Sequence, residues 1–135
     1  MAPHDDDCAL SADFAALVSV SGRLFTLIRA RCWGAEGDPT NAGAAIEEIR
    51  SWSDAAHNLS GFGHLIRRRL SGEGAERLPG EARGLARALR AEAGRSAEGH
   101  PLVAETLRDA ADLVTRLAGR AINGPIDEKG VSLDP

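Results

Sequence analysis

The side chains most able to do chemistry in this sequence lie at helical spacing between residues 50 and 68. Six residues recur there at intervals of three or four: Arg50, Asp54, His57, Gly61, His64 and Arg68. Residues with these spacings share one face of an α-helix. The line contains two imidazoles, a carboxylate and two guanidinium groups, which are groups that bind metal ions, small polar ligands or other proteins.

A metal site is the most demanding interpretation of this line, and the spacing does not favour it. His57 and His64 are two turns apart, about 10.5 Å along the axis, which is too far to share one ion bound at about 2.1 Å. The position one turn from both is Gly61, which has no side chain. Asp54-x-x-His57 resembles half of a di-metal carboxylate motif, but the rest of that motif is missing. We expect no cofactor and no metal.

Three interpretations of the line therefore stay open. The first is a solvated helix face in which Arg50 and Asp54 form an i,i+4 pair worth a few tenths of a kcal/mol. The second is a site for a small ligand or a metal at Asp54, His57 and His64. The third is a face that contacts another protein, with the glycines of the same stretch allowing a close approach. The protein-contact face would comprise Arg50, Asp54, His57, His64 and Arg68.

Signatures of catalysis or nucleotide binding do not occur in the sequence. It has no Gly-x-Ser-x-Gly elbow and no P-loop, and Gly61-x-Gly63 lacks the third glycine and the preceding strand of a dinucleotide fingerprint. Neither Cys8 nor Cys32 has a histidine setting that would make it a nucleophile. We therefore expect the protein not to be an enzyme.

Charge and hydropathy exclude other partners. The net charge is −4, and the Arg67-Arg68-Arg69 triplet spreads around its helix because successive residues point about 100° apart. No aromatic residues interleave with these arginines, so we do not expect nucleic-acid binding. The longest uncharged apolar stretch, residues 14–22, is about half of the ~20 residues that cross a membrane. The N-terminus lacks a secretory signal, which predicts a cytoplasmic protein without a membrane partner.

Proline and glycine divide the chain into four helical segments. Glycines follow the apolar-periodic stretches and prolines open the next ones, an asymmetry typical of helix boundaries. The predicted helices span residues 11–33, 38–70, 79–94 and 100–122, with Ser11 and Asp38-Pro39 at two of the starts. Apolar spacing continues across Gly61 and Gly63, which favours one helix over residues 38–70.

Short connections between amphipathic helices predict an all-α, up-down four-helix bundle with a shorter third helix. We expect one helical-bundle domain over residues 11–124. The acidic residues 1–10 and the tail 125–135 have compositions typical of disordered ends.

The helix predicted at 11–33 carries an apolar arc of about half its circumference. Two neighbours within a monomer can bury such an arc. If the flank with Val20 and Leu27 stays open, a two-fold homodimer would cover it. Taken together, the sequence favours a non-enzymatic helical protein that acts through protein contacts, as a regulator, an inhibitor or an assembly subunit. The identity of that protein partner is not encoded in any motif.

Overall fold

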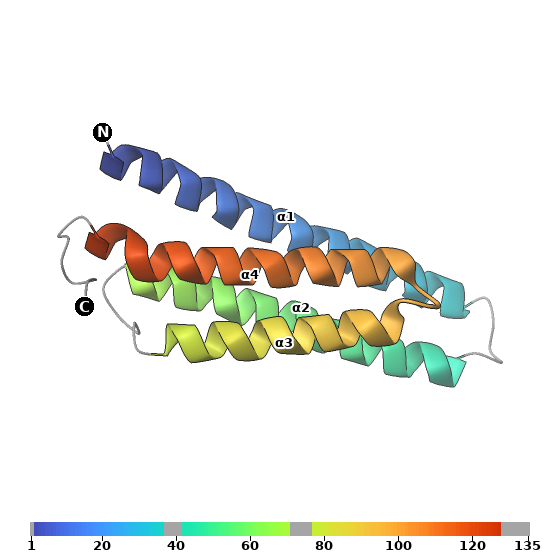
Figure 1. Cartoon of the computed structure of the whole chain (residues 1–135). Coiled ribbons are helices and arrows are strands. Elements are labelled where there is room, and N and C mark those ends of the chain that lie inside the picture. The colour runs from blue at the N-terminus through green and yellow to red at the C-terminus, as the bar shows by residue number, and fades with distance from the viewer. Residues whose placement is uncertain (1, 37–41, 71–76, 128–135) are drawn as a thin grey trace.

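The computed structural model describes residues 2–36, 42–70 and 77–127. They form four helices: α1 (Ala2–Glu36), α2 (Ala42–Leu70), α3 (Leu78–Ser96) and α4 (Pro101–Asp127). These ranges contain no strand. Each helix runs antiparallel to the one before it (Figure 1). The predicted all-α, up-down four-helix fold is therefore confirmed, and α3, with 19 residues, is the shortest helix.

Both ends of the bundle depart from the predicted boundaries. The sequence predicts a helix start at Ser11 after a disordered acidic segment, whereas α1 begins at Ala2. Pro3 and the three aspartates at positions 5–7 are residue types that favour the first turns of a helix, because proline needs no N–H partner there and acids offset the helix dipole. α4 likewise continues past residue 122 to Asp127. The remaining residues of the predicted tail lie outside the described ranges.

α2 is one continuous helix across its glycines, as the apolar spacing predicts. Phe62, between the two glycines, is 4% exposed, so burial of its ring anchors the segment where the backbone has least intrinsic helix preference. The helix start predicted at Asp38-Pro39 lies outside the described residues.

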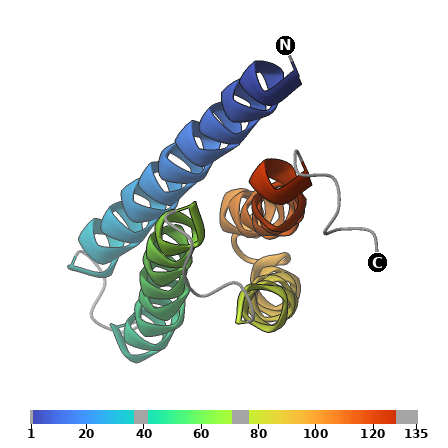
Figure 2. The ribbon, with the colours of Figure 1, turned by 90° about the vertical axis from the view of Figure 1, so that its left-hand side faces the viewer.

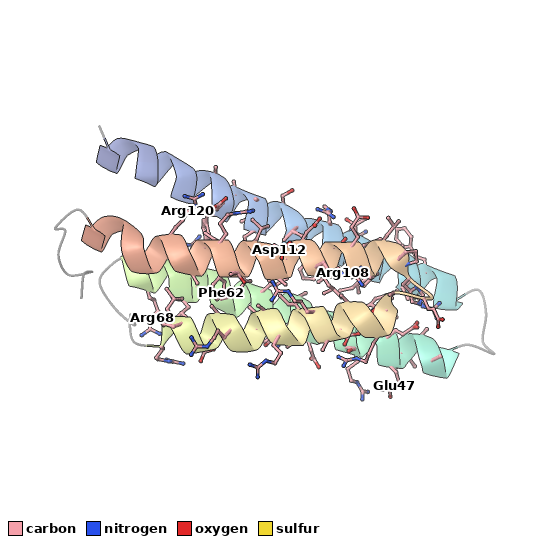
Figure 3. All side chains as sticks on the ribbon, viewed as in Figure 1. Glu47, Phe62, Arg68, Arg108, Asp112 and Arg120 are labelled. Atoms are coloured by element: carbon pink, nitrogen blue, oxygen red, sulfur yellow. The ribbon has the colours of Figure 1, made fainter. Side chains whose placement is uncertain are left out.

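The core is made of leucine, valine and alanine side chains from all four helices, with Trp52 among them. Leu107, Val114 and Leu117 recur at helical spacing on α4 and are fully buried, so this stripe faces the core. Charged side chains project outward along the helices, as Glu47, Arg68 and Arg108 do in Figure 3. No described helix is long and apolar enough to cross a membrane.

α1 is inclined to the other helices, and its first turns lie away from them (Figures 1 and 2). It packs against α2 and α4 but makes no contact with α3. This packing covers most of the flank that carries Val20 and Leu27. Val20 is only 2% exposed and lies beside Asp109 and Leu113 of α4, while Leu27 packs against the core. Val20 is therefore buried within the bundle, Leu27 is half-buried, and their role as dimer contacts stays a prediction.

Candidate functional site

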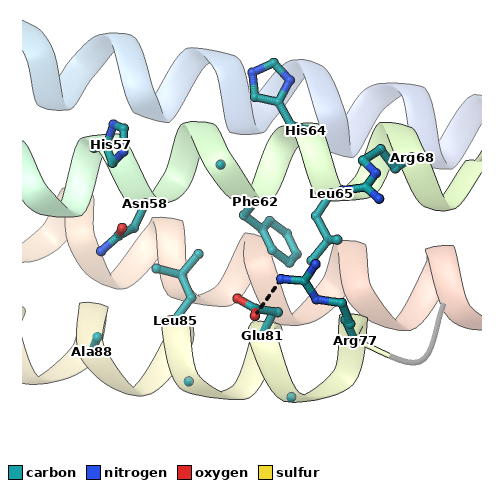
Figure 4. A pocket seen from close by; sticks show the side chains of 13 residues that line it. His57, Asn58, Phe62, His64, Leu65, Arg68, Arg77, Glu81, Leu85 and Ala88 are labelled. Atoms are coloured by element: carbon teal, nitrogen blue, oxygen red, sulfur yellow. Dashed lines mark ion pairs between the residues drawn. The ribbon is translucent and has the colours of Figure 1, made fainter. Parts of the chain in front are cut away.

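A groove of about 550 Å³ lies between α2 and α3 (Figure 4). Its apolar floor is formed by Phe62 and Leu65 from α2 and by Leu85 from α3. Phe62 and Leu65 are almost completely buried, and in Figure 4 both point towards α3. The floor therefore belongs to the bundle core, and the groove opens directly above it.

The groove is open because the residues along its walls are small. Gly61 on α2 and Gly80 and Gly84 on α3 line it, together with Ala88. A Cβ atom added at any of the three glycines would meet nothing within 4 Å. The backbone of a bound segment could come close to both helices at these positions, because no side chain stands in the way.

The rim of the groove carries two guanidinium groups and one carboxylate. Arg68 on α2 and Arg77 just before α3 line it, with Glu81 as the carboxylate of the lining. Arg77 and Glu81 form an i,i+4 ion pair at 3.6 Å with both side chains more than half exposed, drawn as the dashed line in Figure 4. An exposed pair of this kind is held weakly, so a ligand carboxylate can compete for the guanidinium group.

The structure gathers three of the five residues of the predicted contact face. His57, His64 and Arg68 line the groove, although the two imidazoles point away from α3 in Figure 4 and so form its outer edge. Arg50 and Asp54 are exposed but lie outside the lining. At their end of α2, Ser51 Oγ donates a hydrogen bond of 2.5 Å to Glu92 Oε1 of α3, and this contact draws the two helices together.

A metal centre finds no support in this arrangement. Within residues 2–36, 42–70 and 77–127, no group of three or more histidine, cysteine, aspartate or glutamate residues is placed to hold a metal ion. His57 and His64 are both exposed, and Asp54 stands on the same helix as its two proposed co-ligands, as the sequence predicts.

A second polar cluster joins three helices at the opposite end of the bundle. Glu48 on α2 accepts a hydrogen bond from Arg31 Nε of α1 at 2.8 Å, and its other oxygen lies 2.9 Å from His100 Nε2, just before α4. Burial raises the pKa of Glu48, but the hydrogen bonds and charges of Arg31 and His100 outweigh it, so the pKa lies below its usual value. The carboxylate is therefore held in its charged form.

The same cluster reaches into the core through Trp52. The indole Nε1 donates a hydrogen bond of 3.2 Å to Ser96 Oγ, and the His100 ring packs edge-on at 5.0 Å between centroids. Ser96 and Trp52 are both buried, so the hydrogen bond satisfies a polar group that would otherwise be costly inside the core. The contacts of the cluster join different helices, so its role is to stabilise the packing of the bundle.

Sequence reasoning missed this cluster. It assigns Arg31 to a helix end and places Glu48 and His100 near helix starts, which explains each residue separately. The up-down order of the helices is the feature that could have predicted the cluster. In an up-down bundle, the end of the first helix and the starts of the second and fourth meet at the same end of the molecule.

Comparison with known proteins gives no relative. No family model, no curated protein and no solved structure matches the sequence. The class that the fold and the site define is an all-α four-helix protein with an open groove between two of its helices, which carries arginines at its rim.

Proposed function

We propose that the protein is a non-enzymatic binding protein that holds an acidic, amphipathic segment of another protein in the α2/α3 groove. The observation that carries the proposal is the combination of an apolar floor with two arginines at the rim. Apolar side chains of the segment would cover Phe62, Leu65 and Leu85, and its carboxylates would meet Arg68 and Arg77. This is the helix-in-groove mode of recognition, in which one face of a segment supplies affinity and its charges supply orientation.

Regulators, inhibitors and assembly subunits all work by contacts of this kind. The proposal therefore covers all three and does not choose among them. The proposal rests on non-covalent recognition alone. It uses His57 and His64 as polar contacts at the edge of the groove, where an imidazole can donate or accept a hydrogen bond.

The test fills the groove without disturbing the fold. Gly84→Leu places a large side chain in the groove at an exposed helical position where a Cβ meets nothing within 4 Å, and leucine favours a helix more than glycine does. Gly94→Leu is the matched control, because Gly94 is exposed on the same helix, is equally unobstructed and lies outside the groove.

Wild type and both variants are used for affinity capture from the native host, followed by mass spectrometry. We expect a protein that is captured by wild type and by Gly94→Leu and is lost with Gly84→Leu. Equal capture by all three proteins would contradict the proposal. A melting temperature that rises with added Zn²⁺, and no longer rises in His57→Ala, would instead support the ligand or metal alternative at Asp54, His57 and His64.

A further inference from the structure

Exposed apolar side chains gather on the outer face of α1. Val18, Phe25 and Trp33 are 62%, 56% and 65% exposed, and all three belong to this helix. Val18 and Phe25 are seven residues apart, the spacing that keeps residues on one side of a helix in helix–helix packing. Gly22 lies between them, and a Cβ added there would meet nothing within 4 Å. The face is therefore apolar, and at its centre Gly22 leaves the backbone uncovered by any side chain.

This face continues into a groove between α1 and α2. The groove, of about 230 Å³, is lined by Phe14, Val18 and Phe25 of α1 and by Ser60 and Gly63 of α2. Gly63 leaves room for the Phe14 ring, since a Cβ there would be 3.7 Å from Phe14 Cε1. The groove is shallow and mainly apolar, and it extends the exposed apolar face of α1 towards α2.

Both ends of this surface carry arginines stacked on aromatic rings. The Arg67 guanidinium lies 5.7 Å from the centre of the Phe14 ring, and that of Arg29 lies 5.5 Å from the centre of the Trp33 ring. The lining of the α1/α2 groove contains no carboxylate. A helix that covers this surface should therefore be apolar in its middle and carry acidic residues where it meets Arg29 or Arg67.

The first helix of this protein has that composition. Asp5, Asp6 and Asp7 lie near its start, and the exposed apolar side chains follow. In an antiparallel pair of α1 helices with Val18 at the two-fold axis, facing positions have residue numbers that sum to 36. Position 14 then faces Gly22 of the second copy, where no side chain obstructs the approach, and the acidic position 7 faces the basic position 29. Positions 14, 18, 22, 25 and 29 span only about 80° around the helix.

The length of α1 points in the same direction. It has 35 residues, about 52 Å at 1.5 Å per residue, and its first turns lie away from the other three helices (Figure 2). A helical stretch of that kind is marginal in water unless it packs against something. An antiparallel second copy lies along α1 over these turns and covers them.

We infer that α1 docks antiparallel against the α1 of a second copy of this chain, through Val18, Gly22 and Phe25, to form a two-fold homodimer. The interface is isologous, because each copy contributes the same acidic start and the same apolar centre. Val18, Gly22 and Phe25 are not part of the lining of the α2/α3 groove, so variants at these positions test the dimer independently of the proposed function.

The first experiment measures mass by light scattering over a concentration series. A chain of 14.2 kDa should approach twice that mass at high concentration. Phe25→Lys should return it to the monomer mass with its helical circular-dichroism signal intact, whereas Ala30→Lys should stay dimeric, because position 30 is exposed and about 120° around the helix from Val18. A monomeric wild type, or a dimer that survives Phe25→Lys, would overturn the inference.

A second experiment tests the register. In a background with Cys8→Ser and Cys32→Ser, Val18→Cys at the axis should give a covalent dimer on air oxidation and Ala30→Cys should not. Arg29→Asp and Asp7→Arg should each weaken association at least tenfold, and the double variant should restore it. A monomer whose Val18–Phe25 face becomes protected only with anionic vesicles or with a different protein would assign the face to that occupant and refute the homodimer.

Discussion

Glu48 on α2 forms hydrogen bonds with residues from two other parts of the bundle. Its two carboxylate oxygens contact α1 through Arg31 and the start of α4 through His100. About one-third of the side chain is exposed, so solvent weakens the attraction without abolishing it. A carboxylate held by two partners of this kind contributes to stability only while it is ionised.

Replacing Glu48 by glutamine should therefore destabilise the bundle in a pH-dependent way. At neutral pH we expect a loss of about 1 kcal/mol, at the low end for hydrogen bonds to charged groups because the site is partly exposed. The folded pKa of Glu48 is lowered, so its contribution is complete above the unfolded pKa of about 4.3 and is lost as pH falls through the folded pKa. The difference between Glu48→Gln and wild type should shrink under acid.

Urea melts at neutral and acidic pH measure this effect. Glu47→Gln is the matched control, because Glu47 is the exposed neighbour of Glu48 and carries the same charge. An equal loss in both variants, or a loss of the same size at both pH values, would show that the pairing of Glu48 with Arg31 and His100 does not stabilise the fold.

Among the helices, α4 packs against all three others. It contacts α1, α2 and α3, and its inward stripe is free of charge. Three ion pairs hold α1 against it: Asp13 with Arg116, Asp13 with Arg120, and Arg23 with Asp109. The arginines of these pairs are about half exposed, and pairs that are open to solvent contribute at most about 1 kcal/mol each, so the stripe dominates the stability of α4 in the bundle.

Truncating that stripe should be costly. Leu107 and Leu117 are both fully buried, and we expect Leu107→Ala and Leu117→Ala to lower the free energy of unfolding by about 2–5 kcal/mol each. Leu102→Ala serves as the control on the same helix, because Leu102 is 64% exposed and should cost less than about 0.5 kcal/mol. Chemical denaturation gives all three values. Changes below about 1 kcal/mol in both buried variants would be inconsistent with this core.

For the whole molecule, the important feature is that one apolar cluster spans all four helices. Trp52 lies within it, and its indole is tied to the end of α3 through Ser96. A core that is shared in this way leaves no helix with a separate interior, so local unfolding of one helix exposes part of the core of the others.

The protein should therefore unfold in a single cooperative transition. Far-ultraviolet circular dichroism, which reports helix, should be dominated by an α-helical signal and should share its denaturation midpoint with tryptophan fluorescence, to which buried Trp52 contributes. Comparison with a Trp33→Phe variant isolates the Trp52 signal, because Trp33 is mostly exposed. Two separate midpoints would contradict a common core.

The sequence by itself determined the features that depend on local spacing. Apolar periodicity and the positions of proline and glycine predict four helices and a continuous α2, because these depend on residues a few positions apart. The start of the first helix differs from the prediction, since α1 begins at Ala2 rather than at Ser11, and the aspartates that precede Ser11 are residues that favour the first turn of a helix.

Only the tertiary structure decided which faces meet. The apolar arc of α1 is wider than its neighbours can cover, so spacing alone cannot tell that α4 buries Val20 while Val18 and Phe25 remain outside. The same holds for Arg31, Glu48 and His100, which are far apart in sequence and come together only because the helix ends that carry them meet at one end of the bundle. Periodicity orders residues around one helix axis, whereas the relative positions of the axes are set by packing among all four helices.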